Sequence, residues 1–145
     1  MKKLAVLFVF LLMSCNSNPT GSSTPADISG TWGISYTNLQ GSGISCSTSR
    51  ITYTITQTGS TFTGSSTSTY TLTCVQGTTQ TSTASGAVIS NGNVNGSSIS
   101  FDLATSAYHQ AGVISGNSIS GTCTWSLAVG GSTVVLTGQF GGTRQ

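Results

Sequence analysis

Three side chains could do acid–base chemistry: His109, the single histidine, and Asp27 and Asp102, the two carboxylates. With one of the 26 serines, Asp102 and His109 could form a Ser-His-Asp set, in which the serine attacks a carbonyl carbon. However, the chain contains no G-x-S-x-G elbow to present such a serine. Asp102 alternates with the apolar Phe101 and Leu103, so we predict that it faces solvent, and we predict a loop around His109. We therefore expect no enzymatic activity and no catalytic residue.

The composition excludes further classes of function. Charged residues make up 4% of the 145 positions, whereas Ser, Thr and Gly number 26, 25 and 19. With four basic side chains, no surface can neutralise a run of phosphates, so nucleic-acid binding is excluded. The histidine and the cysteines lack the close spacing of metal ligands, so we expect no metal. The glycines do not have the spacing of a nucleotide-binding loop, so we expect no cofactor.

The first fifteen residues, MKKLAVLFVFLLMSC, have the order of an export signal. Two lysines precede ten apolar residues, which span about 15 Å as a helix and are too few to cross a bilayer. The last four residues, Leu12-Met13-Ser14-Cys15, resemble the lipobox of bacterial lipoproteins. The resemblance implies that residues 1–14 are a signal peptide and that Cys15 is acylated with fatty acids such as palmitate. An ordinary secretory signal that is cleaved elsewhere is the alternative.

Residues 15–27 form a segment rich in Ser, Thr and Asn that contains both prolines. Such a segment cannot bury a core, and we interpret it as a flexible linker. The lipid implied at Cys15 makes the membrane the first expected partner, because three acyl chains anchor a protein far more firmly than one. By the same resemblance, Asn16 in place of Asp favours the outer membrane where the source has two membranes.

In residues 28–145, apolar residues recur at every second position with Ser or Thr between them, which is typical of half-buried antiparallel strands. Dipeptides such as Asn91-Gly92 and Asn95-Gly96 mark predicted turns. We predict one all-β domain, a small antiparallel up-and-down barrel of about eight strands, because closure removes edges that so few charges cannot protect. A two-sheet β-sandwich is the alternative. The predicted inward faces include Trp32, Ile34, Tyr36, Ile51, Tyr53, Tyr70, Leu72, Cys74, Ile99, Phe101, Leu103, Cys123, Trp125 and Leu127.

The start and end of this domain resemble lipocalin-like (calycin) β-barrels. Gly30-Thr31-Trp32 matches the Gly-x-Trp on the first strand of those barrels, and Arg144 follows the last predicted strand. The resemblance implies that Arg144 packs across the Trp32 ring at the barrel end as a cation–π pair. It also implies a cavity for a small apolar ligand. The possible lining of that cavity comprises the aromatic residues Tyr53, Tyr70, Phe101 and Trp125.

Apart from Cys15, the cysteines are Cys46, Cys74 and Cys123, which allow three single disulfides. Cys74 and Cys123 belong to strands that a meander would separate, and a disulfide needs Cα atoms within about 7 Å. Cys46 belongs to a looser predicted segment that can adapt its position. We therefore favour a Cys46–Cys74 disulfide, with Cys123 as a buried thiol.

Together these features predict a lipid-anchored, non-enzymatic binding or structural module of the cell envelope. A lipocalin-like carrier of a small apolar ligand and an inhibitor of an exported enzyme are the alternatives. The expected partners besides the membrane are an envelope protein or a small apolar molecule, and we expect a monomer. Because apolar residues are few, we expect side chains to fill the barrel interior. Threonines at alternate positions, such as Thr79, Thr81 and Thr83, are predicted to face outward.

Overall fold

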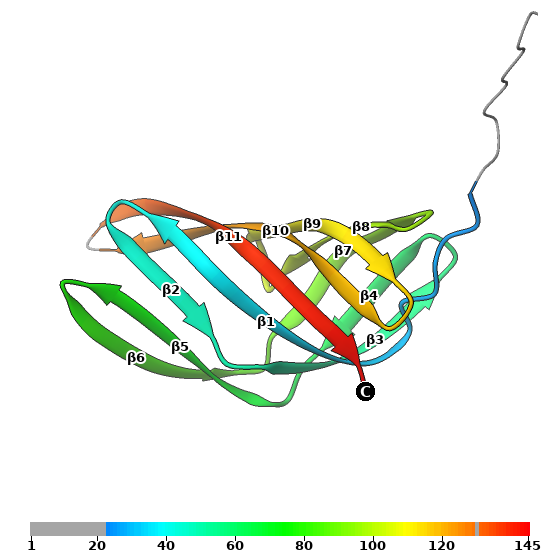
Figure 1. The fold of residues 1–145 in the computed structure, drawn as a ribbon, viewed down its shortest axis with the longest axis horizontal. Coiled ribbons are helices and arrows are strands. Elements are labelled where there is room, and N and C mark those ends of the chain that lie inside the picture. Colours follow the sequence, from blue (N-terminus) through cyan, green and yellow to red (C-terminus); the bar gives the residue numbers. More distant parts are fainter. Residues whose placement is uncertain (1–22, 130) are drawn as a thin grey trace, which may run out of the picture.

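A computed structural model describes residues 23–129 and 131–145, which are arranged as eleven strands (Figure 1). The predicted signal peptide and Cys15 lie outside the described residues. The strands are β1 (Gly30–Gly41), β2 (Ile44–Thr48), β3 (Ile51–Thr58), β4 (Thr61–Ser65), β5 (Thr69–Gln76), β6 (Thr78–Ser85), β7 (Val88–Asn95), β8 (Ser98–Leu103), β9 (Thr105–Ser115), β10 (Ser118–Val129) and β11 (Ser132–Arg144).

Eight of these strands form a closed antiparallel barrel in the order β11-β10-β9-β8-β7-β4-β3-β1. Pairing between β1 and β11, the first and last strands, closes it, with Trp32 opposite Arg144 and Tyr36 opposite Phe140. The prediction of an all-β barrel of eight strands is confirmed, and the sandwich does not form.

The barrel core follows from the alternation in the sequence. Successive side chains of a strand point to opposite faces, so the apolar residues turn inward while Ser and Thr remain on the outer surface. In β3, for example, Ile51, Tyr53 and Ile55 are buried, whereas Thr54 and Thr56 are exposed. The largest fully buried side chains include Trp32, Tyr36, Tyr53, Phe101 and Leu136.

Three strands lie outside the barrel because β1 changes its neighbour halfway along. Residues 30–34 of β1 pair with β3, whereas residues 39–41 pair with β2. From β2 the sheet continues through β5 to β6, so the sheet branches at β1 (Figure 1). At the branched end the barrel wall is therefore replaced by a separate arm, in which β6 is hydrogen-bonded to β5 along one side.

The structure corrects three local expectations. Asn91-Gly92 is not a turn: it lies within β7 as an irregularity in the pairing with β8, where Asn91 has a positive φ of 51°. The segment around Cys46 is not loose but forms β2, and His109 lies in β9 rather than in a loop. In each case strand pairing with a distant segment overrides the local loop signal, since polar residues are tolerated in strands whose outer face meets solvent.

Candidate functional site

A pocket of about 230 Å³ lies where the barrel gives way to the arm. It is bounded by residues of β3, β5, β8, β9 and β10 and by the connection from β6 to β7. The branching of the sheet creates this pocket, because β5 pairs with β2 and β6 and not with a strand of the barrel. Its lining is uncharged and consists of Ile51, Tyr53, Tyr70, Leu72, Ser85, Gly86, Ala87, Leu103, Ala104, Tyr108, Trp125 and Leu127.

Four aromatic rings dominate the pocket, from Tyr53, Tyr70, Tyr108 and Trp125. The Tyr108 and Trp125 rings meet edge to face, with centroids 5.3 Å apart and planes at 84°. Trp125 is also in contact with the Tyr36 ring beneath it, at 5.1 Å between centroids. Ring contacts of this kind hold the aromatic wall in place.

Several polar atoms of the barrel core are buried without a hydrogen-bond partner among the residues that the structure describes. They are the Tyr36 and Tyr53 hydroxyls, the Trp125 indole N–H and both amide atoms of Gln110. Tyr36, Tyr53 and Gln110 are fully buried, and Trp125 is 5% exposed. A buried polar group without a partner costs about 1–3 kcal/mol, so such a cluster points to a polar group that it can bind.

Burial also fixes the protonation state of the phenols. It raises the pKa of Tyr36 and of Tyr53, because the ionised form is poorly solvated there, and the two neighbouring side chains influence each other. The pKa of Tyr70 is raised as well, mainly by burial and secondly by Tyr108. Phenols are protonated at neutral pH in any case, and the raised pKa values keep these hydroxyls protonated, as hydrogen-bond donors, at more alkaline pH as well.

Of the four aromatic residues proposed as cavity lining, the structure brings Tyr53, Tyr70 and Trp125 together around the pocket. Phe101 is separate from it and packs instead against Phe62 and Phe140, at 5.8 and 5.6 Å between ring centroids. The expectation of an interior filled by side chains therefore holds in the closed part of the barrel, but the branched end leaves a pocket.

Tyr108 and Gln110 were not predicted from the sequence. Both lie on the inward face of β9, four and two residues before Gly112, in phase with the buried Ile114. Counting every second residue back from Ile114 would have identified them, but the polar segment SAYHQ was interpreted as a loop.

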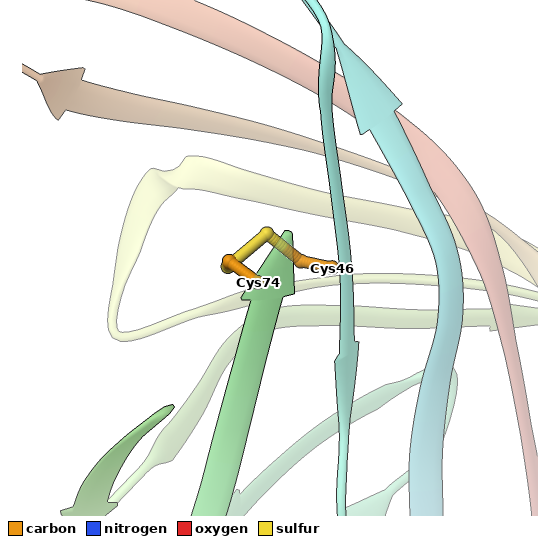
Figure 2. Close-up of a disulfide and its surroundings, with 2 residues drawn as sticks. All are labelled: Cys46 and Cys74. Atoms are coloured by element: carbon orange, nitrogen blue, oxygen red, sulfur yellow. A yellow bond between two sulfur atoms is a disulfide. The ribbon is translucent and has the colours of Figure 1, made fainter. Parts of the chain in front are cut away.

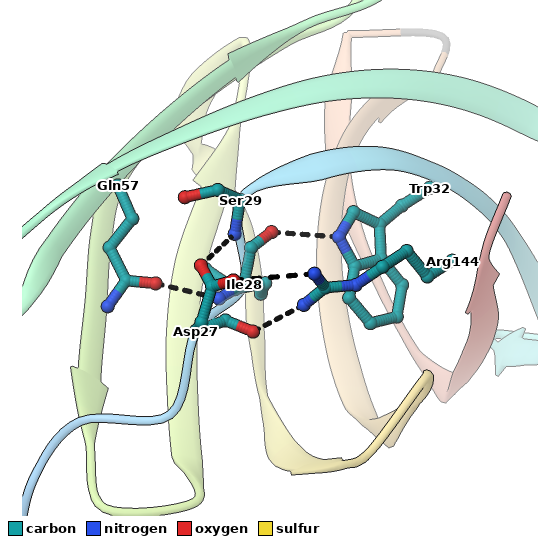
Figure 3. A network of polar contacts seen from close by, with 6 residues as sticks. All are labelled: Asp27, Ile28, Ser29, Trp32, Gln57 and Arg144. Atoms are coloured by element: carbon teal, nitrogen blue, oxygen red, sulfur yellow. Dashed lines mark hydrogen bonds and ion pairs between the residues drawn. The ribbon is translucent and has the colours of Figure 1, made fainter.

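At the opposite end of the barrel, Arg144 covers Trp32 (Figure 3). The guanidinium carbon lies 5.0 Å from the ring centroid, and the indole N–H donates to the Ile28 carbonyl oxygen at 2.8 Å. Arg144 also binds Asp27 through its carboxylate, at 3.4 Å, and through its carbonyl oxygen. A hydrogen bond from the Ser29 backbone N–H is the main cause of a lowered pKa at Asp27, and Arg144 adds to it. This end of the barrel is closed by packing rather than open to a ligand.

Cys46 of β2 and Cys74 of β5 form a disulfide, in agreement with the prediction (Figure 2). The two residues are directly opposite each other in the pairing of the strands, with Cα atoms 4.1 Å apart. The bond therefore ties together two strands of the arm, β2 and β5. Cys123 is a buried free thiol, and burial raises its pKa to about 11.

Asp102 and His109 lie side by side in strands β8 and β9. Their carboxylate and ring Nδ1 lie 2.8 Å apart, and the Asn91 side-chain amide donates to the other carboxylate oxygen at 2.8 Å. The prediction that Asp102 faces solvent is wrong: it is 7% exposed, because Asn91 and His109 cover it on the outer surface. Among the side chains that the structure describes, no serine or threonine hydroxyl is hydrogen-bonded to His109.

The other hollows of the surface are weaker candidates for a binding site. Two larger hollows, of about 470 and 430 Å³, are open to solvent and are lined mainly by small polar residues of the outer sheet surface. Within residues 23–129 and 131–145, no group of three metal-binding side chains comes together. No helix in this part of the chain is long and apolar enough to span a membrane.

The fold and the pocket define a small closed antiparallel β-barrel with an aromatic pocket at its branched end. Comparison with protein-family models, with curated proteins and with solved structures finds no significant match.

Proposed function

We propose that this chain is a lipid-anchored, non-enzymatic binding protein of the cell envelope whose aromatic pocket takes a small, uncharged, largely apolar molecule. The observation that carries the proposal is the pocket of about 230 Å³ with its four aromatic rings. Binding sites for small molecules are typically concave and mostly apolar, with a few polar groups that orient the ligand.

The volume limits the size of the ligand. An apolar cavity of about 150 Å³ holds benzene. The pocket of about 230 Å³ is therefore suited to a molecule with one aromatic ring and a short substituent, or two fused rings. Because no lining residue is charged, a charged ligand would lose its hydration without gaining a counter-ion, so the ligand is neutral.

Hydrogen-bond donors of the pocket lining further define the chemistry of the ligand. The Tyr53 hydroxyl and the Trp125 indole N–H belong to lining residues and have no acceptor. A ligand carbonyl or ether oxygen that reached either group would supply the missing acceptor. The ligand class is therefore a small neutral aromatic molecule that carries a hydrogen-bond acceptor.

The lipid anchor fits such a ligand. The resemblance of Leu12-Met13-Ser14-Cys15 to a lipobox places acyl chains on Cys15, and residues 16–26 are long enough to hold the barrel beside the membrane. Small apolar molecules accumulate in membranes, so a tethered barrel is close to its ligand. The outer membrane is the favoured location where the source has two membranes.

The test uses acetophenone as a probe and a matched pair of variants. Ala87→Leu enlarges a lining side chain, whereas Ala111→Leu makes the same change on the exposed surface of β9. We expect acetophenone to change the tryptophan fluorescence in a saturable way. Ala87→Leu should weaken this binding at least several-fold, and Ala111→Leu should leave it unchanged. Absence of saturable binding, or equal binding by both variants, would overturn the proposal.

A further inference from the structure

Strand β6 ends the arm with a free edge. All eight of its residues pair with β5, from Thr78 opposite Gln76 to Ser85 opposite Thr69, and the strand order ends at β6. The expectation that closure leaves no edge strand therefore does not hold for this arm. Apart from one residue of intermediate exposure, every side chain of β6 is exposed.

The hydrogen bonds of β5 show which backbone groups of β6 are free. The Thr71 carbonyl oxygen accepts from Ser49 N–H, and the Thr71 N–H donates to the Ser49 hydroxyl, so the Thr71 backbone is turned toward β2. Thr83 lies opposite Thr71, and in an antiparallel pair its own backbone groups must then turn away from β5. By alternation, the N–H and C=O groups of Thr79 and Thr81 also point outward.

This edge has none of the features that usually keep edge strands apart. The β6 sequence TTQTSTAS contains no charged residue and no proline, and half of it is threonine, which favours strands. Its pairing with β5 has no irregularity that would twist it away. In Figure 1 the hairpin of β5 and β6 stands apart from β9, β10 and β11, with β6 as its outer strand.

We infer that β6 pairs antiparallel with β6 of a second copy of this chain, around a two-fold axis at Thr81. In that register Thr81 lies opposite Thr81 of the partner subunit, and Thr79 lies opposite Thr83 of the partner subunit. All three outward-turned threonines thus face threonines, and such cross-strand pairs stabilise a sheet. A second copy is the occupant that fits, because an uncharged strand never places like charges opposite each other at a two-fold axis.

The dimer departs from the expectation of a monomer and does not depend on the proposed function. Its arrangement joins two arms edge to edge and leaves each aromatic pocket on the inner side of its own barrel. Because Thr81 is exposed and its backbone groups point away from β5, substitutions there should leave each monomer folded.

Disulfide trapping of the full chain in detergent tests the register. Residues that face each other in a hydrogen-bonded antiparallel pair have Cα atoms about 5.5 Å apart, which a disulfide can bridge. We expect Thr81→Cys to form covalent dimers on mild oxidation, several-fold more than Thr83→Cys, which lies far from its own copy. Thr56→Cys, on the exposed outer face of β3, is the second control. If Thr81→Cys gives no more dimer than Thr56→Cys, the inference is wrong.

Opposite charges provide an independent test by sedimentation. Thr81→Lys and Thr81→Glu should each be monomeric at concentrations where the wild-type chain is dimeric, and a mixture of the two should form dimers again. Thr56→Lys, which adds the same charge to the barrel, should remain dimeric. A wild-type chain that is monomeric at these concentrations would overturn self-pairing.

Discussion

Arg144 lies 5.0 Å from the centre of the Trp32 ring and is also the residue paired with Trp32 across β1 and β11. One side-chain contact thus joins the first and last strands at the point where the barrel closes. Through Asp27, the same guanidinium also fastens the segment that precedes β1. Arg144 thus reinforces, with its side chain, the closure that the pairing of β1 with β11 makes.

Arg144→Ala should therefore lower the free energy of unfolding by about 1–2 kcal/mol, because both the cation–π contact and the contacts to Asp27 are lost. Urea unfolding followed by tryptophan fluorescence measures the change. Arg50→Ala removes the same charge from a side chain with one hydrogen bond, to Thr143, and should cost less. Equal losses in the two variants would show that the ring contact adds nothing.

The Cys46–Cys74 disulfide closes a loop with a sequence separation of 28 residues. Its removal by the double substitution Cys46→Ser, Cys74→Ser should lower the free energy of unfolding by about 3–4 kcal/mol, as loop-closure entropy predicts. Denaturant unfolding with and without a reducing agent measures this. Reduction should destabilise the wild-type chain and leave the double variant unchanged, and Cys123→Ser is the control. A reduction effect that persists in the double variant would contradict the assignment.

Asp102 should contribute to acid stability. Hydrogen bonds from Asn91 and then from His109 hold its pKa below the ordinary value of 3.8. A carboxyl with a lowered pKa stabilises the fold above its unfolded pKa, and this contribution is lost as the pH falls through the folded pKa. Asp102→Asn should therefore cost about 1–2 kcal/mol at pH 7, and the difference should shrink as the pH falls below about 4. Unfolding measured from pH 7 to pH 2 checks this, and a difference that is independent of pH would contradict it.

The Tyr53→Phe variant tests whether a ligand accepts a hydrogen bond from the Tyr53 hydroxyl, separately from whether it binds in the pocket. If the hydroxyl binds a ligand acceptor, acetophenone should bind about 5-fold more weakly to this variant, while ethylbenzene, which has no acceptor, should bind unchanged. Tyr108→Phe, which also changes a pocket residue, is the matched control. Equal losses for both probes would argue against an acceptor on the ligand.

Cys15→Ser tests the lipid anchor. The lipobox resemblance predicts that this variant leaves the membrane fraction and keeps its signal peptide, because modification of the cysteine precedes cleavage in that family. Cell fractionation and the intact mass of the purified chain report both effects. Cys123→Ser, a substitution of a buried cysteine far from the signal, should leave both unchanged. Membrane association that persists in Cys15→Ser would remove the anchor from the proposal.

Much of the architecture could be predicted from the sequence because it depends on local alternation. The inward faces of Trp32, Ile34 and Tyr36, and of Ile51 and Tyr53, follow from a period of two and the exclusion of apolar side chains from water. The number of strands in the barrel followed from the repeated hairpin pattern, and its closure from the scarcity of charges that could protect open edges. The disulfide was favoured because a meander separates the strands of Cys74 and Cys123 and because the segment around Cys46 was expected to be loose. The pairing is right, although Cys46 lies in strand β2.

What the sequence could not determine are the relationships between segments far apart in the chain. Asp102 is covered by Asn91 and His109, which neighbouring strands bring to it, so its alternation with Phe101 gave the wrong environment. The pocket exists because β1 pairs with β3 over one half and with β2 over the other, and no local pattern marks that change.

The amino-acid sequence by itself thus determined the strand pattern and the inward faces, because each depends on residues close together in the chain. For the same reason it predicts an export signal at its start. Only the tertiary structure decided where the sheet branches, which rings gather at the pocket and that β6 keeps a free edge. The physical reason is that hydrogen bonding between strands satisfies any antiparallel neighbour equally well, so the choice among neighbours is made by packing over the whole barrel.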